Sequence, residues 1–125
     1  AVFAELQQVL LNFVVNAEQA VTGENVVERR ITIRTVDIDG RVRLEVEDTG
    51  PGVPAEHEAK LFHAFFTTKP VGEGTGLGLS VSYGIMQGCG GTIGYQRTPQ
   101  GGALFYFEVP AEPELIVAAR PLRRA

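Results

Sequence analysis

Apolar side chains recur every three or four positions over residues 2–21. This spacing places them on one face of an amphipathic helix. The expected buried positions are Leu6, Val9, Leu10, Phe13, Val14, Ala17 and Val21. The polar segment 22–25, which contains Gly23, is expected to end the helix.

Residues 30–38 and 41–48 alternate between apolar and polar side chains, a period typical of strands. The Asp39-Gly40 pair between them is a strong signal for a two-residue hairpin. The expected inward positions of the second strand are Val42, Leu44 and Val46, with Arg43, Glu45 and Glu47 on the other face. Asp48 continues the inward side, so its carboxylate is expected to point toward the interior.

Glycine and proline punctuate the stretch 48–54 too densely for regular structure to continue there, and the stretch 67–76 is expected to be a mobile loop. The remaining expected elements are a short helix over 55–63, a long helix over 77–87 and strands over 92–97 and 103–109. This order predicts an α+β fold, a two-layer sandwich in which about three helices cover one face of a mixed, mostly antiparallel sheet. We expect the domain to occupy residues 1–110, followed by a C-terminal linker or tail over 111–125.

The composition, 44% apolar and 21% charged in 125 residues, is that of one ordinary globular domain. A net charge of −4 without a basic stripe argues against nucleic acid as a partner. The single cysteine, Cys89, excludes an internal disulfide and is expected to be a small buried thiol. No membrane span or signal peptide is visible, so we expect a cytoplasmic domain without membrane contact of its own. An anchor elsewhere in a full-length protein is compatible with this expectation.

Three amide side chains form a line along one side of the first helix. Asn12 and Asn16 lie four residues apart, and Gln8 extends the same line by one turn. Such groups need partners, and the spacing alone leaves two interpretations open: a polar face satisfied by caps or water, or a wall that faces a ligand. In the second case an amide oxygen could bind Mg²⁺, which takes few oxygens from the protein and the rest from phosphates and water.

Asp48 is expected to be a buried acid, and a buried carboxylate needs hydrogen-bond donors. The donor could be an adenine amino group, or locally a backbone turn or the hydroxyl of Thr49. Gly50 and Gly52 favour the ligand, because the absence of Cβ atoms lets a flat group lie against the backbone.

Glycines occupy alternate positions just before the helix expected over 77–87, at Gly72, Gly74, Gly76 and Gly78. Backbone amides at a helix start can bind an anion. The spacing matches neither the dinucleotide fingerprint nor the P-loop, and a flexible linker would have a similar composition.

The order of these segments is more specific than any one of them. Residues 11–20 (LNFVVNAEQA) resemble the asparagine box of the histidine-kinase branch of the Bergerat-fold ATPases, and residues 48–53 (DTGPGV) resemble its first glycine box. Residues 61–69 (LFHAFFTTK) are similar to the phenylalanine box, and residues 74–80 (GTGLGLS) to the second glycine box. The closing strands of the family are echoed by 90–92 and 101–105. The chain therefore resembles, over about residues 5–110, the ATP-binding catalytic domain of a sensor histidine kinase.

This resemblance implies roles for individual residues. Asn16 would bind Mg²⁺ through its amide oxygen, Asn12 would line the γ-phosphate end of the site, and Asp48 would accept from the adenine amino group. Residues 67–75 would form a lid over ATP, from which Lys69 would reach a phosphate oxygen. Asn12, Asn16 and Lys69 are thus the implied catalytic residues. The implied nucleotide contacts are Asn12, Asn16, Asp48, Gly50, Gly52, Val53, Phe62, Thr68, Lys69, Gly74, Thr75, Gly76, Leu77, Gly78 and Leu79.

Two positions depart from the family pattern. Gln19 stands where many members have lysine or arginine, which leaves the phosphate charge to Mg²⁺ and Lys69. Ala103 stands where threonine is common, so one water-mediated contact to adenine is expected to be absent. We expect weaker nucleotide binding as a result, without loss of function.

The resemblance implies transfer of the γ-phosphate of ATP to a histidine on a separate dimerisation domain, and relay to the receiver domain of a response regulator. His57 and His63 are not expected to accept phosphate, because the segment that holds them does not resemble the dimerising hairpin. Since the family dimerises through that hairpin, this domain alone is expected to be monomeric.

Three alternatives remain: a gyrase- or MutL-type ATP-driven clamp, an anti-sigma-type serine kinase, and a nucleotide-sensing interaction module with a decayed site. The clamps have a water-activating glutamate at the position of Asn12, and an amide cannot usefully accept a proton near neutral pH. Intact Asn16, Asp48 and glycines argue against decay. The serine kinase differs in its substrate and has to be distinguished by experiment.

Overall fold

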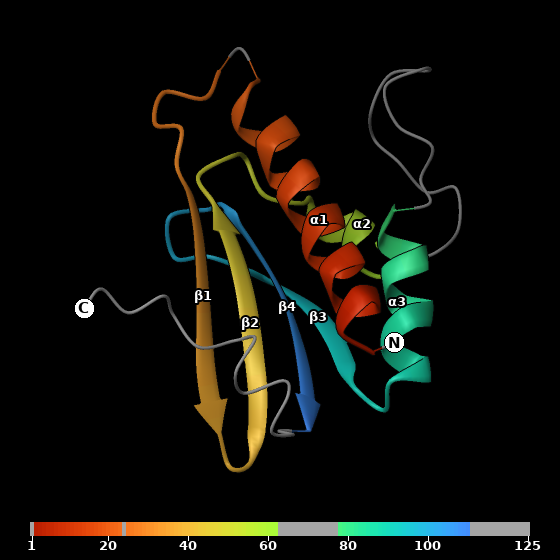
Figure 1. The fold of residues 1–125 in the computed structure, drawn as a ribbon. Coiled ribbons are helices and arrows are strands. Elements are labelled where there is room, and N and C mark those ends of the chain that lie inside the picture. Colours follow the sequence, from red (N-terminus) through yellow and green to blue (C-terminus); the bar gives the residue numbers. More distant parts are fainter. Residues whose placement is uncertain (1, 24, 63–77, 111–125) are drawn as a thin grey trace, which may run out of the picture.

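The computed structural model describes residues 2–23, 25–62 and 78–110, which form a two-layer sandwich of helices on a sheet (Figure 1). The elements are α1 (Val2–Val21), β1 (Ile31–Ile38), β2 (Arg41–Asp48), α2 (Ala55–Glu58), α3 (Gly78–Gly88), β3 (Thr92–Arg97) and β4 (Ala103–Pro110). The expected α+β architecture is confirmed. The expected tail over 111–125 lies outside the described residues, so the domain boundary stays a prediction.

The four described strands form one antiparallel sheet in the order β1-β2-β4-β3. β1 and β2 are joined by the expected two-residue hairpin, in which Asp39 and Gly40 have φ angles of 48° and 79°. Positive φ at both central residues gives the turn the twist of its flanking strands. The pairing of β2 with β4 sets Asp48 opposite Ala103, so the last strand reaches the residue expected to bind the base.

The helices lie on one face of the sheet, and the core fills the space between the layers (Figure 1). Val9 and Phe13 of α1 and Met86 of α3 are fully buried. The Phe13 ring contacts two rings of β4, with its centroid 5.6 Å from Phe105 and 6.2 Å from Phe107. Full burial of each such side chain contributes about 1.5–3 kcal/mol. The apolar stripe of α1 therefore fixes this helix against β4.

The opposite face of the sheet is a charged, solvent-facing surface, as the alternation in β2 predicts. Arg43 pairs with Glu45 at 2.8 Å and with Glu108 at 3.0 Å, and its guanidinium lies 3.8 Å above the Tyr106 ring. Arg34 of β1 pairs with Glu45 and with Glu47. The side chains of these pairs are partly buried, and such pairs contribute modestly to stability.

Two sequence expectations were wrong in detail. The helix expected over 55–63 ends at Glu58, after which Lys60 and Leu61 donate backbone hydrogen bonds to residues three positions earlier, as in tighter turns. Cys89 is only partly buried, and its thiol donates to a carboxylate oxygen of Glu5 at 3.5 Å. Within the described residues, no helix has both the length and the apolar character needed to cross a bilayer.

Candidate functional site

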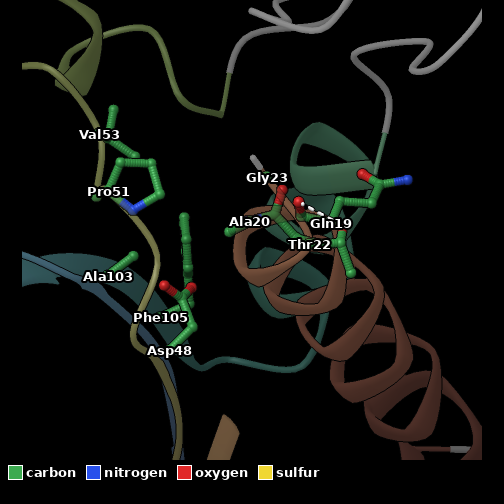
Figure 2. Close-up of a pocket in the computed structure, with 11 residues that line it drawn as sticks. Gln19, Ala20, Thr22, Gly23, Asp48, Pro51, Val53, Ala103 and Phe105 are labelled. Carbon is green, nitrogen blue, oxygen red and sulfur yellow. Dashed lines mark hydrogen bonds between the residues drawn. The ribbon is translucent and has the colours of Figure 1, made fainter. Parts of the chain in front are cut away.

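A cavity of about 650 Å³ opens between the C-terminal end of α1 and the loop that follows β2. Figure 2 shows its two walls: Gln19, Ala20, Thr22 and Gly23 on the helical side, and Asp48, Pro51, Val53, Ala103 and Phe105 on the side of the sheet. Asn16 and Gly52 complete the lining. Sites for small ligands commonly measure about 300–1,000 Å³, so the volume suits a nucleotide.

Asp48 places a buried carboxylate in this cavity, as the alternation in β2 predicts. Its side chain ends β2, and the residue is only 2% exposed. The backbone N–H of Gly50 donates to Asp48 Oδ1 at 2.9 Å. Burial raises the pKa of the Asp48 carboxyl above its ordinary value, and the backbone N–H groups of Gly50 and Ala103 act in the opposite direction. The sheet thus holds a hydrogen-bond acceptor against an otherwise apolar wall.

Of the two local hydrogen-bond donors considered for the Asp48 carboxylate, the backbone turn and the Thr49 hydroxyl, only the first is observed. The backbone turn at Gly50 does supply a donor to the carboxylate. Thr49 does not take this role, because its hydroxyl accepts from the Arg30 N–H at 2.9 Å and donates to the Glu28 carbonyl at 2.6 Å. Since Asp48 lines the cavity, a ligand can still approach its carboxylate.

The structure supplies a reason for Gly50 and Gly52 that differs from the one expected from the sequence. A Cβ at Gly50 would lie 2.9 Å from the Cβ and the carbonyl oxygen of Ala20. A Cβ at Gly52, where φ is +74°, would lie 2.5 Å from the Gly101 carbonyl oxygen. Both glycines therefore let the loop pack against its own protein neighbours, and Gly52 also lines the cavity.

The two asparagines of α1 have different surroundings. Asn16 lines the cavity. Asn12, one turn earlier, contacts α3: its Nδ2 donates to the Gly78 carbonyl at 3.1 Å and to Ser82 Oγ at 3.0 Å, and its Oδ1 accepts from Gln8 at 3.0 Å. Asn12 thus connects α1 to the first turn of α3, and the role at the γ-phosphate stays a prediction.

Only some of the other predicted site residues are among those that the structure describes. Gly78 begins α3, and Leu79 beside it packs against the core. Phe62 also packs against the core, with its ring centroid 6.1 Å from that of Tyr83. The predicted contacts Thr68, Lys69, Gly74, Thr75, Gly76 and Leu77 lie outside the described residues, as does His63.

Sequence reasoning did not identify Phe105 as a residue of the cavity wall, nor Ala20, Thr22 and Gly23 at the C-terminal end of α1. Phe105 is 2% exposed and forms part of the cavity wall two residues beyond Ala103. Its position follows from the pairing of β4 with β2, which apolar periodicity alone does not reveal. Both departures from the family pattern, Gln19 and Ala103, do line the cavity, on opposite walls.

The cavity has features that suit a magnesium nucleotide. Its sheet wall combines an acceptor, Asp48, with the apolar side chains of Val53, Ala103 and Phe105, a combination that can hold a flat base with an amino group. Among the described residues, no three acidic, histidine or cysteine side chains are grouped to hold a metal by themselves. The amide of Asn16 would suit a Mg²⁺ that takes its remaining ligands from phosphates and water.

A family model described as histidine kinase-, DNA gyrase B- and HSP90-like ATPase matches residues 2–113. The chain belongs to this ATPase family. The sensor histidine kinase ZraS of Klebsiella oxytoca is 43% identical over 105 residues, which cover 84% of this chain and 22% of the kinase. The sensory/regulatory protein RpfC of Xanthomonas campestris pv. campestris is 40% identical over 113 residues, which cover 86% of this chain and 15% of RpfC. The chain thus spans about a fifth or less of these relatives.

Solved histidine-kinase structures share the fold of this ATPase domain. The catalytic domain of the histidine kinase ThkA matches with a TM-score of 0.73 at 42% identity, covering 89% of this chain and 69% of that one. Full-length ShkA in complex with AMPPNP matches with a TM-score of 0.72 at 37% identity, covering 85% and 21%. A complex of ThkA with the response regulator TrrA matches with a TM-score of 0.67 at 39% identity, covering 87% of this chain and 29% of that one.

Proposed function

We propose that this chain is the ATP-binding catalytic domain of a two-component sensor histidine kinase. It binds Mg-ATP in the cavity between α1 and the loop after β2, and it presents the γ-phosphate to a histidine on a separate dimerisation domain. The phosphate then passes to the receiver domain of a response regulator. The single observation that carries this proposal is the buried Asp48 carboxylate in a cavity of about 650 Å³.

Binding and positioning are the tasks that this site has to perform. Phosphoryl transfer asks little covalent chemistry of the protein, which mainly orients the nucleotide and neutralises charge. Asp48 would orient the base, Asn16 would hold Mg²⁺, and Mg²⁺ would neutralise the phosphate charge. The Gln19 amide on the helical wall carries no charge, so this wall adds no cation of its own at that position.

The relatives support both the nucleotide and the response regulator in this proposal. The match to ShkA with AMPPNP supports a nucleotide in the cavity, because AMPPNP is an ATP analogue. The match to ThkA in complex with TrrA supports a response regulator as partner. A cytoplasmic location and a monomeric domain belong to the same proposal, and equilibrium sedimentation that gives a tight dimer would contradict the latter.

The environment of Asn12 favours the kinase over an ATP-driven clamp. Asn12 stands where the clamps have a water-activating glutamate. Its side-chain amide forms hydrogen bonds with Gln8, Gly78 and Ser82. Of the acids on α1, Glu5 accepts from Cys89, and Glu18 lies on the exposed side. No described carboxylate therefore stands one turn before Asn16 to activate water.

Calorimetric titration with AMPPNP, with and without Mg²⁺, tests the cavity. We expect saturable, Mg²⁺-sensitive binding that is lost in Asp48→Ala and retained in Asp37→Ala, which removes an exposed acid of β1. Equal binding by both variants would place the nucleotide elsewhere, and no binding by the unsubstituted chain would favour a decayed site.

Phosphoryl transfer then tests the reaction with a histidine-bearing hairpin supplied in trans. Labelled γ-phosphate should appear on the hairpin as an acid-labile phosphohistidine. Acid-stable labelling of a serine substrate, with none on the hairpin, would support the serine kinase. Steady ATP hydrolysis without an acceptor would support the clamp.

A further inference from the structure

Two side chains of β3 attach the loop after β2 to the sheet. The hydroxyl oxygen of Tyr95 accepts a hydrogen bond from the Val53 N–H at 3.0 Å. The guanidinium of Arg97 donates to the Val53 carbonyl oxygen at 3.2 Å. Side chains of β3 thus bind both backbone polar groups of a residue that lines the cavity.

The Arg97 guanidinium also reaches the turn between β3 and β4. It donates to the Gly101 carbonyl oxygen at 3.2 Å, while its second nitrogen contacts Val53. That turn leads directly into Ala103, which lines the cavity beside Asp48. One planar fork therefore joins the two loops that border the sheet side of the site.

The Tyr95 ring connects the same loop to the cavity wall. Its centroid lies 5.2 Å from that of Phe105, at an interplanar angle of 50°. Phe105 is buried and lines the cavity, so Tyr95 contacts this wall through its ring and the loop through its hydroxyl. A loop held in this way keeps its shape before a ligand arrives, which lowers the ordering cost of binding.

We propose that Tyr95 and Arg97 are positioning residues, which hold the backbone of Val53 so that the wall beside Asp48 is preformed for the base of the nucleotide. The inference rests on the proposed function, because it requires a nucleotide in this cavity. Neither side chain is among the described residues that line the cavity, so both act through Val53.

Tyr95→Phe and Arg97→Lys separate these contacts from the packing around them. Phenylalanine keeps the ring against Phe105 but removes the acceptor for the Val53 N–H. Lysine keeps the charge but lacks the planar fork that serves two carbonyl groups. Tyr106→Phe and Arg41→Lys make the same changes on the outer face of the sheet and serve as matched controls.

Three measurements on the 125-residue chain are compared. They are the Kd of AMPPNP and of ADP, the midpoint of urea unfolding, and the hydrogen-exchange rate of the Val53 amide. We expect each positioning variant to raise both Kd values about fivefold, the effect of one net hydrogen bond. The two nucleotides should respond alike because the change lies at the base. Val53 exchange should accelerate in Tyr95→Phe, while both controls bind as the original chain does.

The outcomes distinguish positioning from a purely structural role. A lower unfolding midpoint with unchanged Kd values would overturn the inference, and so would faster Val53 exchange with unchanged Kd values. Failure of the unsubstituted chain to bind either nucleotide would refute the proposed function and the inference with it.

Discussion

Replacing Gly102 by alanine is expected to force the sheet apart beside Asp48, at the proposed nucleotide site. A Cβ at this buried glycine would lie 2.1 Å from the backbone carbonyl oxygen of Asp48. Close C–H···O contacts between strands are about 3.3 Å or longer, so β2 and the turn before β4 would have to separate by about 1 Å. The obstructing atom belongs to the backbone and has no rotamer by which to move away.

The expected cost is about 2–3 kcal/mol, at the upper end of what overpacking usually costs. With a urea m-value of about 2 kcal/mol/M, the unfolding midpoint falls by roughly 1–1.5 M. Nucleotide affinity should fall at least about tenfold, because the displaced residue carries the carboxylate proposed to accept from the base and hydrogen bonds to charged groups contribute about 1.5–3 kcal/mol.

Gly84→Ala is the matched control, since it adds the same methyl group elsewhere. Gly84 lies in the exposed middle of α3, where an added Cβ meets nothing within 4 Å. Alanine favours a helix interior over glycine by about 0.5–1 kcal/mol, so this variant should be slightly more stable and bind nucleotide normally. Equal midpoints for the Gly102 variant and the original chain, or shifts of the same sign in both variants, would refute the reasoning.

Three further outcomes are expected. Burial raises the pKa of Asp48, so its charged form costs stability, and the contribution of Asp48 to the free energy of unfolding declines as pH rises from about 4 through the raised folded pKa. Asp48→Asn should therefore lose nucleotide binding, yet gain in urea stability relative to the original chain from pH 4 to pH 7. Gln19→Lys should strengthen AMPPNP binding about two- to fivefold in a salt-dependent way, with no effect on adenosine, measured by titration at two salt concentrations. Phe13→Leu should lower stability by about 1–2 kcal/mol, while Phe3→Leu, at a side chain 48% exposed, should change little in the same urea series.

The parts of the fold that depend on local pattern could be predicted from the sequence. The stripe of α1 and the inward direction of Asp48 follow from periods of 3.6 and 2, and the hairpin follows from its Asp39-Gly40 turn residues. The end of α2 could not be predicted in this way. Its four residues carry no side-chain cap and bury none of their side chains, so neither signal marked the boundary.

The site was predicted less completely because its walls come from distant parts of the chain. Asp48 could be assigned from its own strand, whereas Phe105 enters only through the pairing of β2 with β4. The proposed roles of Tyr95 and Arg97 depend on where the loop after β2 meets side chains of β3, and no sequence period encodes that contact. Gly50 and Gly52 were recognised as special, yet their constraint proved to be packing against Ala20 and Gly101.

Adjacent positions of the proposed site are under different packing constraints. Gly102 has no room for a Cβ, because the backbone of Asp48 lies against it. Ala103, the next residue, lines the cavity. Gln19 faces the same cavity from the opposite wall and is exposed, so its replacement alters the lining of the cavity with little effect on packing. We therefore expect substitutions at 19 and 103 to alter nucleotide binding without disturbing the sheet, whereas a side chain at Gly102 would displace the backbone of Asp48.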